Sequence, residues 1–107
     1  MGDTIEVAGA HPQTDGQLPR LVVFTSPKSG LCRQVEGWVA HVMQVRRNRQ
    51  KIKLVTVDAD ARPDLVERFR VEQLPTLFVV ENKIARAKLE RPRGVLQINA
   101  LVAPWLL

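Results

Sequence analysis

The chain has 107 residues, 45% of them hydrophobic and 25% charged, which is typical of one globular domain with an ordinary core. No apolar run approaches the ~20 residues that a membrane span requires, and the acidic N-terminal residues Asp3 and Glu6 argue against a secretory signal. A single cysteine, Cys32, excludes an intramolecular disulfide within these residues, and the net charge of +5 favours acidic partners. Together these features predict a soluble, cytoplasmic protein.

The first 19 residues contain Gly9, Pro12, Gly16 and Pro19, so residues 1–19 are predicted to be a flexible lead-in, with Thr4–Val7 as a short edge strand. Residues 20–107 are predicted to form the domain. Apolar or alternating runs predict its strands, which are Leu21–Thr25, Ile52–Val57, Thr76–Val80 and Ile84–Leu89. Glu81-Asn82-Lys83 is the expected turn between the last two.

Three segments have helical periodicity. The clearest runs from Leu31 to about Arg47, where one arc of about 160° collects the apolar side chains Leu31, Cys32, Val35, Trp38, Val39, Val42, Met43 and Val45. A second helix is predicted to begin at Arg62-Pro63-Asp64. A last helix follows Gly94 and carries Val95, Leu96, Ile98, Leu101 and Val102 at helical spacing.

The predicted element order is (β)–β–α–β–α–β–β–α. Crossovers through a helix predict parallel pairing of the first three strands, whereas the last two strands pair antiparallel through their short turn. We therefore expect an α/β fold in which a central mixed sheet of four to five strands is flanked by three helices.

The stretch Leu21–Arg33 joins an apolar strand to a helix through Ser26-Pro27. Ser29 is a good N-cap for that helix, because its hydroxyl can accept from an N–H two or three residues later. Ser29 as a nucleophile would need a base. His41 lies nine residues beyond Cys32, about 13 Å further along the helix, and His11 lies in the lead-in, so a Ser–His site is not expected.

Four local matches within residues 20–103 resemble the thioredoxin-like superfamily. The first is Phe24 followed five residues later by Ser29-Gly30-Leu31-Cys32-Arg33, which resembles the family's aromatic residue and Cys-Gly-Pro-Cys-Lys. The others are Val57–Asp60, the segment Phe69–Leu77 with its Leu74-Pro75-Thr76, and the charged turn, strand and Gly-initiated helix from Glu81 onward. This resemblance implies a thioredoxin-like fold in which the Leu74–Pro75 bond is cis and faces the turn.

The chain also departs from the family's pattern. Ser29 stands where the resemblance places the attacking cysteine, Leu31 replaces the proline, and Cys32 alone remains as the resolving-type thiol. Val23 and Lys28 occupy the positions of the family's buried acid and tryptophan, and the region Glu90-Arg91-Pro92 replaces its glycine before the last helix. A serine cannot form a disulfide, so dithiol exchange at this turn is not expected.

The predicted function is recognition of an extended protein segment in a groove between Ser29–Cys32 and Leu74–Thr76. The resemblance assigns the binding residues, which are Lys28, Gly30, Leu31, Leu74, Pro75 and Thr76. The backbone of Leu74 would pair with the segment as in β-augmentation. The enzymatic alternative is a monothiol redox protein that acts through Cys32. The helix N-terminus and Lys28 favour a thiolate there, whereas burial on the core-facing stripe opposes it.

A third alternative is a basic interaction module. The basic residues form two clusters, which are Arg46, Arg47, Arg49, Lys51 and Lys53, and Lys83, Arg86, Lys88, Arg91 and Arg93. With only five aromatic residues and no recognisable motif, the clusters are predicted to be solvated faces, with an acidic protein partner as the next alternative and nucleic acid as the last. Asp58, Asp60 and Asp64 lack the pattern of a calcium loop, so we expect neither a metal nor a cofactor. A monomer is favoured, although the sequence does not determine the oligomeric state.

Overall fold

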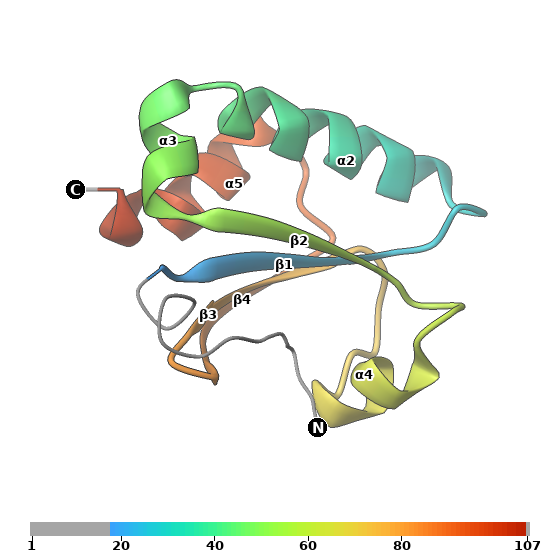
Figure 1. Ribbon diagram of the computed structural model, residues 1–107. Helices are drawn as coiled ribbons and strands as arrows, with labels where there is room; N and C mark the ends of the chain where they lie inside the picture. The colour runs from blue at the N-terminus through green and yellow to red at the C-terminus, as the bar shows by residue number, and fades with distance from the viewer. Residues whose placement is uncertain (1–17, 107) are drawn as a thin grey trace.

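The structure, a computed structural model, describes residues 18–106 (Figure 1). One mixed sheet of four strands has the order β2-β1-β3-β4. The strands are β1 (Arg20–Thr25), β2 (Lys53–Asp58), β3 (Thr76–Glu81) and β4 (Ile84–Glu90). The four predicted strands are thus confirmed to within one residue at each end. The fifth, at Thr4–Val7, lies outside the described residues.

The direction of β3 differs from the prediction. β1 and β2 are parallel as expected, but β3 pairs antiparallel with β1, and Thr76 lies opposite Phe24. The helix between β2 and β3, α4 (Pro63–Arg68), has six residues and is therefore only about 9 Å long, less than half the ~20 Å of a six-residue strand. Because this helix cannot carry the chain back along the sheet, β3 starts at the end where β2 stops.

The long predicted helix is in fact two helices, α2 (Gly30–Met43) and α3 (Arg46–Lys51). Val45 has an extended conformation between them and is 48% exposed, although the periodicity places it on the buried arc. Side chains of α3 terminate α2. Asn48 Nδ2 donates to the carbonyl of Val42, and Arg49 Nη1 donates to the carbonyls of Met43 and Gln44. These donors satisfy carbonyl groups that the end of a helix leaves without partners.

The last helix, α5 (Val95–Val102), is followed by a short 3₁₀ turn, η1 (Ala103–Trp105). Leu96 was expected on its apolar stripe but is 78% exposed. Val95, Ile98 and Val102 lie on one side at intervals of three and four residues, whereas Leu96 is about 100° away from Val95. Residues 18–106 thus contain four α-helices where three were predicted, and these helices cover both faces of the sheet, as the predicted α/β architecture requires (Figure 1).

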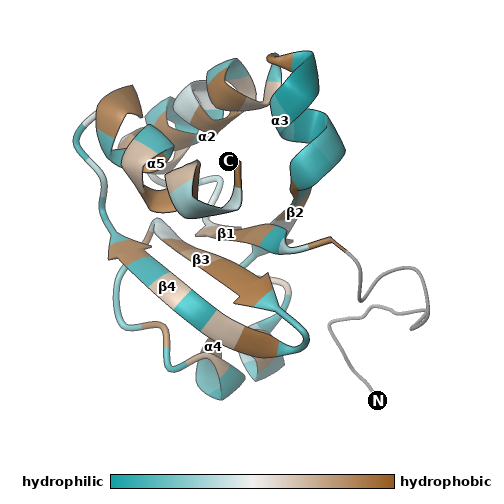
Figure 2. Cartoon of the chain, turned by 90° about the vertical axis from the view of Figure 1, so that its left-hand side faces the viewer, coloured by the Kyte–Doolittle hydropathy of each residue, from teal (hydrophilic) through white to brown (hydrophobic). Residues whose placement is uncertain are grey.

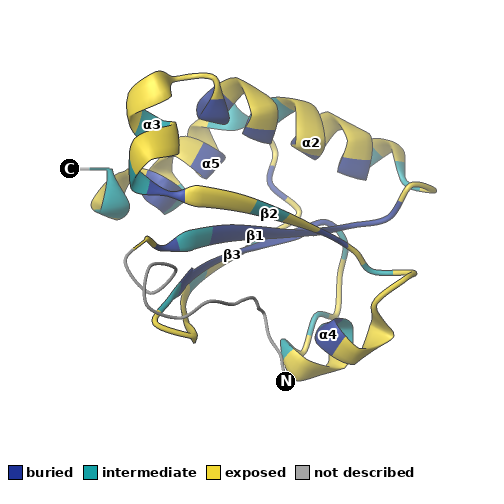
Figure 3. Cartoon of the chain, in the orientation of Figure 1, coloured by how far each residue is buried: buried dark blue, intermediate teal, exposed yellow. Residues whose placement is uncertain are grey.

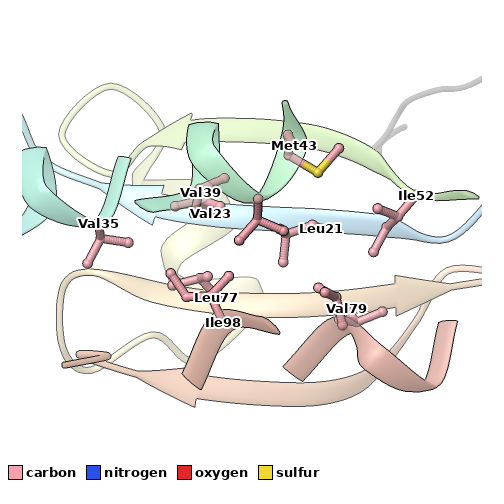
Figure 4. Close-up of a cluster of buried hydrophobic side chains, with 11 residues drawn as sticks. Leu21, Val23, Val35, Val39, Met43, Ile52, Leu77, Val79 and Ile98 are labelled. Atoms are coloured by element: carbon pink, nitrogen blue, oxygen red, sulfur yellow. The ribbon is translucent and has the colours of Figure 1, made fainter. Parts of the chain in front are cut away.

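Alternate residues of β1 supply two cores. Leu21 and Val23 pack with α2 and α5 on one face, in the cluster that Figure 4 shows. Val22 and Phe24 pack on the opposite face beneath α4, where the rings of Phe24, Phe69 and Phe78 lie 5.0 to 5.7 Å apart between centroids. A strand covered on both faces has no polar side, which explains the uninterrupted apolar run of the sequence. In Figure 3, the buried side of α2 faces the sheet.

Candidate functional site

Four chain segments meet at one end of the sheet. Phe24 lies opposite Thr76 in the antiparallel pair, so the end of β1 and the start of β3 lie at the same end of the sheet. The amide of Ala59, just after β2, donates to the carbonyl of Thr25 at 2.8 Å. The amide of Arg91, just after β4, donates to the carbonyl of Pro75 at 2.8 Å. The turn before α2 therefore follows β1 at the end of the sheet where the Leu74–Thr76 segment leads into β3.

Ser29 is the N-cap of α2. Its hydroxyl oxygen accepts from the amide of Cys32 at 3.2 Å, and its own amide donates to the carbonyl of Ser26 at 3.2 Å. The predicted capping role is confirmed. His41 lies in the last turn of α2, about 18 Å along the helix from Ser29, and His11 lies outside the described residues. The hydroxyl of Ser29 is thus committed to the helix backbone and has no histidine base on α2 within reach.

Cys32 has no exposed surface, so it is more deeply buried than its place at the edge of the apolar arc predicts. Its Sγ atom accepts from the amide of Ser26 at 3.3 Å. Complete burial withholds the sulfur from reactants. The hydrogen bond between Cys32 and Ser26 therefore links the start of α2 to the segment that follows β1.

Ser26 and Asp60 belong to this site, and sequence reasoning did not assign them to it. Ser26 is 7% exposed, and its hydroxyl donates to Asp60 Oδ2 at 3.0 Å while accepting from the amide of Lys28 at 3.3 Å. Asp58 Oδ1 accepts from the amide of Asp60 at 2.9 Å. A signal was present in the sequence, because Ser26 and Asp60 each follow the end of one of two parallel strands, whose ends meet at one edge.

Asp64 was grouped with these acids by spacing, but it lies on α4 and pairs with Arg62 at 3.0 Å. The hydrogen bonds from Arg62 hold the pKa of the exposed Asp64 carboxyl below its ordinary value. Among residues 18–106, no group of three or more His, Cys, Asp or Glu side chains is arranged to hold a metal ion.

The Leu74–Pro75 peptide bond is cis. Pro75 and Thr76 are buried, and the hydroxyl of Thr76 donates to the carbonyl of Gln73, so the side chains of these two predicted binding residues lie beneath the surface. Leu74 is partly exposed, but its carbonyl already accepts from Arg91 Nη1 at 2.7 Å. Arg91, which the sequence analysis placed in a basic cluster and in the region that replaces a glycine, therefore binds the backbone carbonyl that was expected to pair with a ligand.

The outer surface of this end is formed by Lys28 and Gly30, which are exposed, and by Leu31 and Leu74, which are partly buried. We call these four residues the turn surface. A Cβ atom built on Gly30 would meet no other atom within 4 Å, so the space above the start of α2 is open. The turn surface therefore combines the cation of Lys28 with two partly buried leucines, of which Leu31 packs on the α2 side of the sheet and Leu74 on the α4 side. The guanidinium groups of Arg33 and Arg91 bind backbone carbonyls at the same end.

None of the described helices is long and apolar enough to span a membrane. The family model described as thioredoxin matches residues 13–103. Thioredoxin 1 of Nostoc sp. is 34% identical over 65 residues, which are 61% of this chain and 59% of that protein. The thioredoxin of Synechocystis sp. is 32% identical, again over 61% of this chain and 59% of that protein. The aligned region thus spans less than two thirds of either relative.

Solved structures share the fold at low sequence identity. Fasciola hepatica thioredoxin superposes with a TM-score of 0.75 at 13% identity, covering 86% of this chain and 86% of that one. The germline-specific thioredoxin Deadhead of Drosophila melanogaster superposes with a TM-score of 0.73 at 19% identity, covering 82% and 81% of the two chains. At such identities the likeness establishes the fold alone.

Proposed function

Because this chain belongs to the thioredoxin family, we propose that it is a member without dithiol chemistry that recognises an extended protein segment at the turn surface. In this proposal the site has the same location as in the family, but it binds a protein segment and does not exchange disulfides. A single cysteine cannot both attack a disulfide and resolve the resulting intermediate within one chain.

The proposal rests on one observation: Ser29 and Cys32, the first and last residues of the Ser29–Cys32 motif, both have structural roles. The Ser29 hydroxyl caps α2, and the Cys32 sulfur is inaccessible and accepts a backbone hydrogen bond. Both groups therefore support the shape of the turn. The groups that remain available to a partner are Lys28, Gly30, Leu31 and Leu74, which suit binding.

Arg91 gives the proposed binding mode a specific consequence. A segment that pairs with the backbone of Leu74 must displace the guanidinium group from the Leu74 carbonyl. That contact is exposed to solvent, so its loss costs little in the free protein. Arg91→Ala should consequently bind the segment at least as tightly as the unmodified chain does.

The experiment uses fluorescein-labelled, S-carboxymethylated insulin B chain, an unfolded polypeptide without free thiols, in a fluorescence anisotropy titration. Gly30→Phe adds a bulky side chain to the turn surface in open space, and Gly37→Phe adds the same side chain about 10 Å along the same side of α2, also in open space. Gly30→Phe should weaken binding at least about tenfold, and Gly37→Phe should leave it unchanged. Equal affinities of Gly30→Phe and Gly37→Phe for the peptide would refute the proposal. The absence of binding by both the unmodified chain and Arg91→Ala would also refute it.

One observation favours a second candidate, a monothiol redox protein. Cys32 is the single cysteine of the sequence and lies in the first turn of α2, next to Leu31 of the turn surface. Insulin reduction with an external thiol separates the two functions. Turnover by the unmodified chain that disappears in Cys32→Ser supports monothiol catalysis, whereas turnover that appears only in Ser29→Cys supports recognition by an intact but redox-inactive turn.

A further inference from the structure

A long acid-free part of the chain folds into one end of the molecule. Residues 37–57 contain five lysine or arginine residues and no aspartate or glutamate. They form the second half of α2, all of α3 and β2 up to Val57. Since α3 connects the end of α2 to the start of β2, these cations gather at the end of the sheet that is remote from the turn surface (Figure 1).

The helix α3 adds little to the core. None of its six residues is buried, and its whole length is hydrophilic (Figure 2). Asn48 and Arg49 turn toward α2, whose last carbonyls they bind. At 100° per residue, the other residues, Arg46, Arg47, Gln50 and Lys51, fall within an arc of about 140° on the remaining side. Two of these residues, Arg46 and Arg47, are exposed cations.

Exposed aliphatic groups flank the cations. Val45, immediately before α3, is 48% exposed, and Leu54, on the edge strand that follows, is 36% exposed. Lys53 is exposed between α3 and Leu54. We call Val45, the outer side of α3 and Leu54 the basic end.

We propose that the basic end is a second interaction surface, which binds an acidic protein segment whose carboxylates lie among aliphatic residues. Arginine side chains bind carboxylates in a bidentate manner, and no acidic residue of the span 37–57 competes for them. Val45 and Leu54 provide apolar contacts, which interfaces between proteins combine with charge.

Other polyanions fit this surface less well. Single-stranded nucleic acids are held by cations together with aromatic rings, and the chain has no Phe, Trp or Tyr between Val39 and Arg68. A helix that binds a lipid surface inserts an apolar face, and α3 contains no apolar residue. A peptide partner requires neither feature.

The two surfaces lie at opposite ends of the sheet. Lys53 starts β2 opposite Arg20 at the start of β1, whereas the turn surface follows the last residues of β1. Six-residue strands separate them by about 20 Å. A partner at the basic end would therefore leave the turn surface accessible. Binding at one surface can consequently be disproved without affecting the proposal for the other.

The test is an anisotropy titration with a fluorescein-labelled peptide of alternating glutamate and leucine, at 50 mM and 300 mM KCl. We expect Arg46→Glu/Arg47→Glu to bind at least about tenfold more weakly than the unmodified chain, and the higher salt to weaken binding of the unmodified chain. The matched control, Lys83→Glu/Arg86→Glu, changes the net charge equally with exposed residues at the opposite edge of the sheet, and should retain most of the affinity.

Equal losses in the two double variants would mean that only net charge matters, and would overturn the proposal. An affinity that is unaffected by Arg46→Glu/Arg47→Glu or by salt would do the same. Single-stranded DNA or phosphatidylserine vesicles serve as competitors, and preferential binding of either over the peptide would replace the acidic protein segment with another class of partner.

Discussion

The two ends of the sheet are built in different ways. At the turn end, polar side chains act within the protein. Ser29 caps a helix, Ser26 joins two strand ends through Asp60, and Arg91 binds the carbonyl of Leu74. At the basic end, α3 buries no residue and directs Arg46 and Arg47 toward solvent. The turn end is thus fixed by internal contacts, and the basic end is defined by its exposed charges.

This difference indicates how each end tolerates a change of sequence. The position of the turn follows from the register of β1 with β3 and from the packing of α2, so its shape can persist while the chemistry of one side chain is lost. The basic end depends on individual cations and loses its character when they are replaced. Mutations of the buried and capping residues at the turn end should therefore affect stability, whereas mutations of the exposed Arg46 and Arg47 at the basic end should affect binding.

The largest expected effect comes from the core beneath the turn. Phe24 is completely buried and packs against the rings of Phe69 and Phe78. Phe24→Ala should lower the free energy of unfolding by about 3–5 kcal/mol, through lost burial and the remaining cavity. Urea denaturation measures this change, with Leu96→Ala, at a side chain 78% exposed, as a control that should stay within about 0.5 kcal/mol. Equal stability of Phe24→Ala and the control would show that the turn end does not rest on this core.

A smaller loss is expected for the cap. Ser29→Ala removes the acceptor for the Cys32 amide and should lower the free energy of unfolding by about 1 kcal/mol. Ser29→Thr retains a hydroxyl and should restore most of that stability in the same denaturation experiment. If Ser29→Ala were as stable as the unmodified chain, the hydroxyl would be free for another role.

The smallest expected effect is a difference in stability between variants of an inward-facing and an outward-facing arginine of α3. Arg49→Ala removes the donor to the carbonyls of Met43 and Gln44 and should cost about 0.5–1.5 kcal/mol of stability. Arg47→Ala removes an exposed side chain and should change stability by less than about 0.5 kcal/mol. Differential scanning calorimetry can compare the two variants, and a larger loss for Arg47→Ala would contradict the assignment of the outer side of α3.

Periodicity predicted the strands and the capping role of Ser29, because both depend on neighbouring residues. It did not predict the break at Val45, since the donors that end α2 come from Asn48 and Arg49 in the next helix. The parallel direction expected for β3 was wrong because handedness rules apply to crossovers long enough to return along the sheet. Contacts such as Ser26 with Asp60 and Arg91 with Leu74 join residues 34 and 17 positions apart, which no local pattern encodes.

The central claim is that Cys32 supports the turn and is withheld from chemistry in the folded protein. The most direct measurement is the rate of alkylation of Cys32 by iodoacetamide at pH 8, in the folded chain and in 6 M guanidinium chloride. Because Cys32 has no exposed surface, we expect the folded chain to react at least about a hundredfold more slowly, through occasional opening of the turn. A folded chain that reacts as fast as the unfolded one, or faster, would contradict the claim and favour a reactive monothiol.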